Sequence, residues 1–189
     1  EGLQALEMLF TKERASFEGQ YYTFTDIEMA PKSRAQPFPL YIGGHNLEAI
    51  ERAARYGQGW LPGWRPLAEM KERIAQLKAR ATELGRNPSD IEIAPQFSVT
   101  IDKTLEKAEK RYMASGLVAH RESLAYTGRD LSHQVIANLV GSADVILEKV
   151  ATLKKIGVDH CSALMFPANS VAEMDDQVEQ FATEVMAKL

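Results

Sequence analysis

Two adjacent glycines, placed between an apolar run and a segment with helical spacing, are the residues of this sequence best suited to binding a ligand. The run Leu40 to Ile42 leads into Gly43 and Gly44, and Asn46 can cap a helix by accepting a hydrogen bond from a backbone N–H two or three residues on. Such a turn brings free N–H groups and the positive end of a helix together at one edge of a sheet, which suits a phosphate. A tight turn that needs glycine only for backbone room explains the same residues, because a lone pair of glycines is a weaker signal than a full glycine-rich fingerprint.

The side chains next to this turn suggest an anion site that depends on the backbone. His45 borders the glycines and could donate a hydrogen bond to a phosphate or to a substrate oxyanion, although a surface histidine at a helix start is the alternative interpretation. No arginine or lysine adjoins the turn in the sequence, so we expect backbone N–H groups to bind any phosphate there. His160 and Cys161 precede or enter an apolar strand and are interpreted as structural residues. The sequence contains neither a nucleophile–base pair nor a metal-ligand spacing.

A second group of residues could form the wall of a substrate pocket. Trp60, Pro62 and Trp64 surround the loop after the second predicted strand, where an aromatic wall could hold a flat cofactor or an apolar substrate. Gln96 and Ser98 lie on the polar side of the alternating strand 91–101, which faces inward if helices cover the apolar side. The alternatives are core packing for Trp60, a loop cover for Trp64, and a half-solvated edge strand for 91–101. Pro95 indicates a bulge or an edge position in that strand.

The elements that carry these residues alternate between strands and amphipathic helices. Residues 1–11 have helical spacing, and 15–29 predict a β-hairpin that turns at 18–20. Apolar stripes predict helices at Leu47–Gly57, Met70–Leu84, Ile146–Ile156 and Met174–Val185, and 158–166 reads as a buried strand. The order is β-α-β-α-β-insertion-α-β-α, which implies a parallel sheet with right-handed crossovers. Four such strands in 189 residues make about half of a (β/α)8 barrel, which takes roughly 250 residues.

Composition and charge are typical of one globular domain. The chain is 45% hydrophobic and 25% charged, and its net charge of -4 without a basic stripe argues against nucleic-acid binding. No apolar run approaches the ~18 residues of a membrane span, and no signal peptide is present. One cysteine is compatible with a reducing cytoplasm. We divide this single domain into 1–36 (helix and hairpin), 37–101 (the first three strands and their helices), 102–140 (an insertion, expected to be helical and mobile) and 141–189 (the last αβα unit).

Several stretches together resemble the bacterial luciferase-like monooxygenase family, and the likeness covers nearly the whole chain. They are Phe17-Glu18-Gly19-Gln20-Tyr21-Tyr22, Pro37-Phe38-Pro39-Leu40-Tyr41-Ile42-Gly43-Gly44, Glu51-Arg52-Ala53-Ala54-Arg55-Tyr56-Gly57-Gln58-Gly59-Trp60-Leu61-Pro62, Gly85-Arg86-Asn87-Pro88-Ser89-Asp90-Ile91, Val140-Gly141-Ser142 and Gly157-Val158-Asp159-His160. Their order matches the C-terminal half of such proteins. One position departs from the family pattern: Gln58 stands where the family usually has Asp, a residue that we interpret as structural.

The resemblance implies the C-terminal half of a TIM (β/α)8 barrel that uses reduced FMN or coenzyme F420. It places Gly43 and Gly44 against the cofactor phosphate, with His45, Asn46 and Leu47 at the start of the helix, and it makes 102–140 a family insertion that can act as a lid. In this class the flavin carries the redox chemistry, while the protein orients the reactants and excludes water. The expected partner is a small-molecule substrate.

Three functional hypotheses remain open at this point. The first is the C-terminal part of a flavin- or F420-dependent oxidoreductase. The second is a catalytically inactive half-barrel that pairs with itself, as a homo-oligomer, or with a missing N-terminal half, since open sheet edges are a liability. The third is a phosphate-binding aldolase or isomerase, which would need a lysine base or paired carboxylates at strand ends, and none is found.

Overall fold

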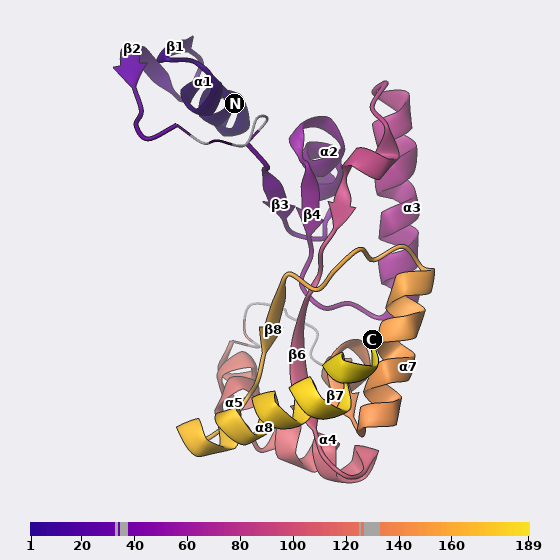
Figure 1. Cartoon of the computed structure of the whole chain (residues 1–189). Coiled ribbons are helices and arrows are strands. Elements are labelled where there is room, and N and C mark those ends of the chain that lie inside the picture. Colours follow the sequence, from indigo (N-terminus) through magenta and orange to yellow (C-terminus); the bar gives the residue numbers. More distant parts are fainter. Residues whose placement is uncertain (33, 35–37, 125, 127–132) are drawn as a thin grey trace.

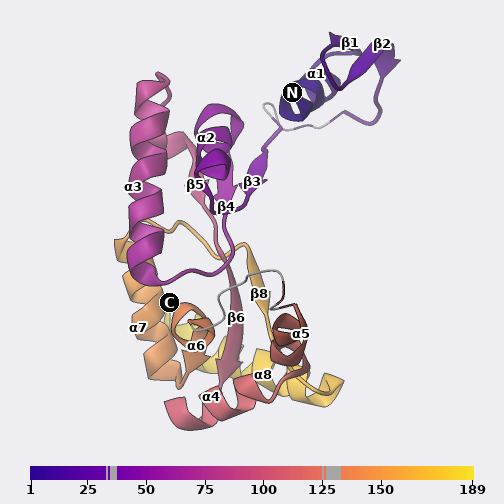
Figure 2. The same ribbon diagram turned by 180° about the vertical axis from the view of Figure 1, so that it is seen from behind.

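The computed structural model describes residues 1–32, 34, 38–124, 126 and 133–189, which form an α/β structure with parallel strands (Figure 1). A helix and hairpin lie at one end of the molecule, and the C-terminal helix α8 lies at the other (Figure 1 and Figure 2). The parallel (β/α) units and the N-terminal helix and hairpin are those expected from the sequence. The buried strand expected at 158–166 is wrong in extent and burial, because β8 covers only Ala163–Met165 and its side chains are half-buried or exposed.

All the pairings among the strands that follow the hairpin are parallel. These strands are β3 (Tyr41–Gly43), β4 (Gly59–Leu61), β5 (Glu92–Ile93), β6 (Gln96–Ile101), β7 (Leu139–Gly141) and β8 (Ala163–Met165). β4 pairs with β3 and β5, while β6 lies between β7 and β8. Between β5 and β6, Ala94 N still donates to Trp60 O at 2.9 Å and Gln96 N to Pro62 O at 3.0 Å. β5 and β6 are therefore one interrupted strand, which pairs with β4 along its first part and with β7 and β8 along its second part.

The interruption at Pro95 is confirmed, but the edge position suggested for this strand is wrong. β6 has a neighbour on each side, and every side chain from Phe97 to Ile101 is buried. The half-solvated face is therefore absent, because helices cover both faces of β6. Phe97, Val99 and Ile101 pack into the main core, and the insertion covers the side that carries Ser98.

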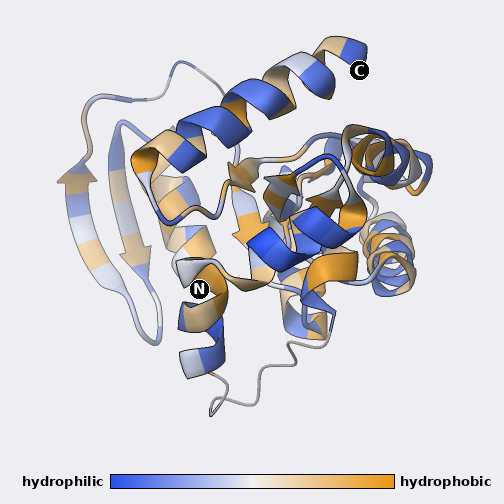
Figure 3. Ribbon diagram, turned by 90° about the horizontal axis from the view of Figure 1, so that it is seen from below, coloured by the Kyte–Doolittle hydropathy of each residue, from blue (hydrophilic) through white to orange (hydrophobic). Residues whose placement is uncertain are grey.

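The helices that follow the strands are amphipathic, and hydrophobic and hydrophilic residues alternate along them in Figure 3. Their bounds are α2 (Leu47–Tyr56), α3 (Leu67–Glu83), α7 (Ala143–Lys155) and α8 (Val171–Glu184), with short 3-10 turns η1 (Pro88–Asp90) and η3 (Met186–Lys188). Met70, Ile74, Leu77 and Ala81 of α3 are at most 3% exposed, so the predicted stripe of this helix is confirmed. Together with the strand side chains they form the main core.

Three residues of the predicted stripes are not in the core. Leu47 is 58% exposed because it starts α2 beyond the end of β3, and Ala49 and Ala53 are buried instead. Met174 and Val178 of α8 are also exposed, whereas the polar Gln177 is fully buried. Gln177 takes the inward position because its side-chain carbonyl accepts a hydrogen bond from Ile101 N at 2.9 Å.

Polar side chains complete the hydrogen bonding of the strands in several places. Each accepts a hydrogen bond from a strand N–H or from the residue before a strand, which would otherwise lack a partner. These acceptor–donor pairs are Gln58 Oε1 with Leu40 N (2.9 Å), Asp159 Oδ2 with Ile93 N (2.8 Å), Asn138 Oδ1 with Ser98 N (2.7 Å) and Gln177 Oε1 with Ile101 N (2.9 Å). The bond of Gln58 fits the structural role inferred for this position.

The N-terminal unit contains α1 (Gly2–Thr11), β1 (Arg14–Glu18) and β2 (Thr23–Glu28). The two strands are antiparallel, so the predicted hairpin is confirmed. Stacking of Phe10 on Phe38, with ring centroids 4.3 Å apart, links α1 to the residues before β3. Part of the predicted connector 30–39, namely 33 and 35–37, lies outside the described residues.

The insertion is helical where it is described. It contains α4 (Leu105–Met113), α5 (Gly116–Ser123) and α6 (Gln134–Ala137), and it ends in the unpredicted strand β7. A strand of three residues is too short to show a hydrophobic period, which is why the sequence did not reveal β7. Residues 125 and 127–132 of the insertion lie outside the described residues. Among the helices of the described residues, none is long and apolar enough to cross a membrane.

A salt bridge between α2 and α3 makes a testable prediction about pH. Hydrogen bonds from Arg80 (2.6 Å) and Arg55 (2.6 Å) lower the pKa of Glu51 from 4.5 to about 2. Because the pKa is lower in the folded state, this stabilisation is complete above about pH 4.5 and is lost as the pH falls toward 2. We expect the melting temperature of Glu51→Gln to fall less steeply over this range than that of the unmodified chain. Glu48→Gln, on the same helix without an ion pair among the described residues, serves as control; equal slopes for both variants would contradict the prediction.

Candidate functional site

The glycine turn lies at the C-terminal end of β3, beside the loop that follows β4. In parallel (β/α) units this edge is where ligand-binding loops gather. Gly44 has φ +105°, a conformation that side chains other than glycine rarely adopt, and a Cβ there would lie 3.1 Å from the Cβ of Ala49. Asn46 caps α2 as predicted, because its Oδ1 accepts from Ala49 N at 2.9 Å.

The backbone of this turn has unused donors. No residue in the described part of the chain accepts a hydrogen bond from the N–H groups of Gly44, His45, Asn46, Leu47 or Glu48. Residues 43–48 are exposed, and a Cβ at Gly43 would meet only the carbonyl oxygen of Leu61, 4.0 Å away. Free N–H groups at the start of a ten-residue helix, with space in front of them, fit a phosphate group.

Trp60 holds the glycine turn from the side of the core. Its indole Nε1 donates to the carbonyl oxygen of Gly44 at 2.7 Å, and the whole residue is buried in the core between the sheet and α3. The hydrogen bond fixes the carbonyl of Gly44 toward the core, away from the exposed side of the turn. Trp60 therefore acts as a support of the turn, and its place in the wall of a substrate pocket stays a prediction.

An arginine does adjoin the turn in space, contrary to the expectation that the backbone acts alone. Arg65 Nη2 contacts His45 Nε2, and Arg65 Nε lies 3.5 Å from Glu69 Oε1. Desolvation lowers the pKa of His45, the charges of Arg65 and Arg73 add to this effect, and Glu69 opposes it. His45 is therefore neutral near pH 7, and the positive charge beside the turn belongs to Arg65.

Sequence reasoning missed Arg65 because it considered only neighbours along the chain. Arg65 follows Trp64 in the loop after β4, and β4 pairs with β3 in parallel register. The loops after paired parallel strands meet at the same sheet edge, so residues twenty positions apart become neighbours. Applied to the predicted strands, this rule could have shown that Arg65, the charged residue after Trp64, lies near His45.

The residues predicted to line the substrate pocket lie in several environments. Trp64 is half-buried, and the guanidinium carbons of Arg65 and Arg121 lie 5.9 and 5.7 Å from its ring centroid. Pro62 is buried, and its carbonyl oxygen accepts a hydrogen bond from the backbone N–H of Gln96. The side chain of Gln96 is half-buried. The membership of these residues in one pocket stays a prediction.

Ser98 is fully buried beneath the insertion. Its hydroxyl accepts a hydrogen bond from Arg121 Nη2 at 3.1 Å, and Arg121 Nη1 donates to the hydroxyl of Tyr112 at 2.6 Å. Burial raises the pKa of Tyr112, and bonds to Ser98 and Arg121 oppose this rise without cancelling it. Tyr112 is therefore a neutral phenol, and Arg121 is the charged group of this network.

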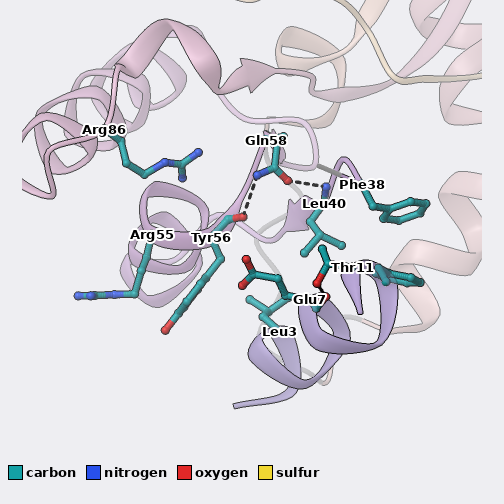
Figure 4. Close-up of a pocket in the computed structure, with 10 residues that line it drawn as sticks. Leu3, Glu7, Thr11, Phe38, Leu40, Arg55, Tyr56, Gln58 and Arg86 are labelled. Atoms are coloured by element: carbon teal, nitrogen blue, oxygen red, sulfur yellow. Dashed lines mark hydrogen bonds between the residues drawn. The ribbon is translucent and has the colours of Figure 1, made fainter. Parts of the chain in front are cut away.

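A cavity at the opposite edge of the sheet does not suit the same role. It has a volume of about 170 Å³ and is lined by residues of α1 and by Leu40 and Gln58, which precede β3 and β4 (Figure 4). Figure 4 shows the amide of Gln58 bonded to the backbone of Leu40 and Tyr56, so its polar atoms are already in use. This N-terminal edge of a parallel sheet is the edge associated with stability.

Residues 1–160 match the family model for luciferase-like monooxygenases. The chain is 23% identical over 214 aligned positions to the FMNH2-dependent dimethylsulfone monooxygenase of Pseudomonas putida, covering 98% of this chain and 56% of that protein.

Solved structures show the same fold. The monooxygenase RslO1 from Streptomyces bottropensis aligns with a TM-score of 0.77 at 18% identity, covering 99% of this chain and 59% of that one. An F420-dependent secondary alcohol dehydrogenase aligns with a TM-score of 0.75 at 19% identity, covering 97% and 59%. The chain spans about half the length of the curated relatives that it matches. These overlaps agree with the expected partial barrel.

Proposed function

Because this chain belongs to the luciferase-like monooxygenase family, we propose that it is the C-terminal part of a flavin- or F420-dependent oxidoreductase and that its glycine turn binds the cofactor phosphate. The observation that carries the proposal is the exposed turn 43–48, whose five free N–H groups lie beside Arg65. Relatives of both cofactor classes exist, one FMNH2-dependent and one F420-dependent. The cofactor of this chain is thus FMN or coenzyme F420.

Each residue of the turn has a distinct task in this proposal. The N–H groups of Gly44 to Glu48 donate to phosphate oxygens, Arg65 supplies the positive charge, and neutral His45 donates or accepts a hydrogen bond beside it. Asn46 keeps α2 in place through its cap, and Leu47 starts that helix. When bound, the reduced cofactor supplies the hydride or the oxygen chemistry. The substrate is a small molecule held against the same sheet edge.

A non-catalytic half-barrel is the second candidate, and the open edges of the sheet favour it. Among the described residues, β3 pairs only with β4 and β8 pairs only with β6. Open edges of this kind favour pairing with another sheet. In this case the chain pairs with a second copy or with the other half of a barrel, and its mass in solution exceeds that of one 21.1 kDa chain without any cofactor being bound.

The proposal predicts how cofactor binding responds to charge. We expect FMN or F420 to bind with an affinity that falls about tenfold in Arg65→Gln, which is the usual effect of losing one charged hydrogen bond. Arg55→Gln removes the same charge at the far end of α2 and serves as the matched control. The measurement is a titration followed by visible absorption and fluorescence. Absence of binding of both cofactors, or equal affinities in the two variants, would contradict the phosphate site.

A further inference from the structure

Arg121 of α5 joins three separate elements on the side of β6 that faces away from the main core. Its Nη1 donates to Tyr112 of α4, its Nη2 donates to Ser98 of β6, and its guanidinium carbon lies 5.7 Å from the ring centroid of Trp64. We call Arg121, Ser98, Tyr112 and Trp64 the Arg121 cluster. Only two of the five guanidinium N–H groups are used in these bonds.

The charge of Arg121 has no counterion within the described part of the chain. Its hydrogen-bond partners are neutral hydroxyls, and no carboxylate of these residues lies within 4 Å of it. Arg111, which the same insertion carries on α4, pairs with Glu173 at 2.9 Å. A half-buried guanidinium costs free energy when it lacks an anion, since burial removes part of its hydration. Among the described residues, the guanidinium of Arg121 is thus left without an anionic partner.

The position of the cluster connects it to the proposed cofactor turn. Trp64 also lies beneath the guanidinium of Arg65, which contacts His45 next to the glycines. One indole ring thus separates the residues of the cofactor site from Arg121. Ser98 and Arg121 lie on the side of β6 opposite the main core, because Phe97 and Val99 point into that core. A substrate beside a cofactor at this edge would contact the indole and the free side of Arg121.

We propose that Arg121 binds an anionic group of the substrate, so that the substrate is a small acid with a carboxylate, sulfonate or phosphate group. This proposal rests on the proposed function. The planar guanidinium offers paired N–H donors to two oxygens of such a group, and Trp64 offers apolar surface to the rest of the molecule. Ser98 and Tyr112 hold the guanidinium in place and are positioning residues.

The alternative is that Arg121 only fastens α5 to the sheet. The two roles differ in what an added anion does. If Arg121 is a fastener, anions have no specific effect, and Arg121→Gln lowers the melting temperature equally with and without them. If Arg121 binds an anion, the ligand stabilises the folded state by mass action, and this stabilisation disappears with the guanidinium.

The test uses methanesulfonate, acetate and inorganic phosphate as probes for the 189-residue chain, at constant ionic strength. We expect saturable changes in tryptophan fluorescence and a rise in melting temperature, with binding about tenfold weaker in Arg121→Gln. Trp64→Phe should remove the fluorescence change but keep the rise in melting temperature. Arg121→Lys keeps the charge and controls for failure to fold. Responses that do not saturate, or that are equal in the unmodified chain and Arg121→Gln, would overturn the proposal.

Two further variants separate this site from the cofactor phosphate site. Arg65→Gln should keep the response to methanesulfonate and lose affinity for FMN or F420. Arg121→Gln should lose the response to methanesulfonate and keep its affinity for the cofactor. If no cofactor binds but the probes still saturate through Arg121, the proposed function fails and the anion site stands. If a cofactor binds, and the probes compete with it in a way that depends on Arg65 and not on Arg121, the proposed function is supported and the proposed anion site at Arg121 is wrong.

Discussion

Replacing Trp60 with alanine is expected to lower the free energy of unfolding by about 3–5 kcal/mol, as for other buried tryptophans. Trp60 is completely buried in the main core, so its removal leaves a cavity between the sheet and α3. It also leaves the carbonyl oxygen of Gly44 without its indole donor. The loss is a large part of the total stability of a typical domain, about 5–15 kcal/mol. Chemical denaturation followed by far-UV circular dichroism measures it.

A conservative change at the same position separates packing from support of the turn. Trp60→Phe keeps much of the apolar volume but cannot donate a hydrogen bond to Gly44. We expect it to lose less stability than the alanine variant and still to weaken cofactor binding, because the turn is no longer held by the indole. Cofactor affinity equal to that of the unmodified chain would show that the 2.7 Å bond to Gly44 has no role in binding.

Replacing Gly44 with valine should have the largest effect on cofactor binding. The φ of +105° is strained for any β-branched residue, at a cost of about 1–3 kcal/mol, and the new Cβ would meet that of Ala49 at 3.1 Å. The turn must therefore shift, which moves the free N–H groups away from the phosphate. We expect affinity for FMN or F420 to fall by about tenfold or more while the helices and strands persist. Titration and circular dichroism of the same sample measure both effects.

Gly43 provides the matched control for this variant. A Cβ at Gly43 would have only the carbonyl oxygen of Leu61 nearby, at 4.0 Å, so Gly43→Ala should keep the stability of the unmodified chain. Equal stability of Gly44→Val and Gly43→Ala would show that the backbone of residue 44 is not constrained as described. Equal cofactor affinity in Gly44→Val and the unmodified chain would contradict the assignment of the turn.

Local features of the chain were predictable because short-range physics controls them. The cap by Asn46, the stripe of α3 and the hairpin depend on residues at most a few positions apart in the sequence or across one turn. The end of α2 at Gly57 was also predicted. Gly57 has an ordinary φ of −77°, and glycine is needed because a Cβ would lie 3.0 Å from the carbonyl oxygens of Ala53 and Gly59.

The charged groups of the candidate site could not be predicted in this way. Arg65 reaches His45 across two parallel strands, and Arg121 reaches Ser98 from the insertion, 23 positions further along the chain. The same insertion buries Ser98, which alternation alone left open between a pocket and a wet face.

The linear order of residues thus settles the alternation of strands and helices, the glycine turn and its helix cap, because backbone conformation and hydrophobic period are local properties. Only the folded chain decides which cations stand beside the turn and which polar residues are covered. That outcome depends on the pairing of distant strands and on where the insertion packs, and neither leaves a periodic mark in the sequence.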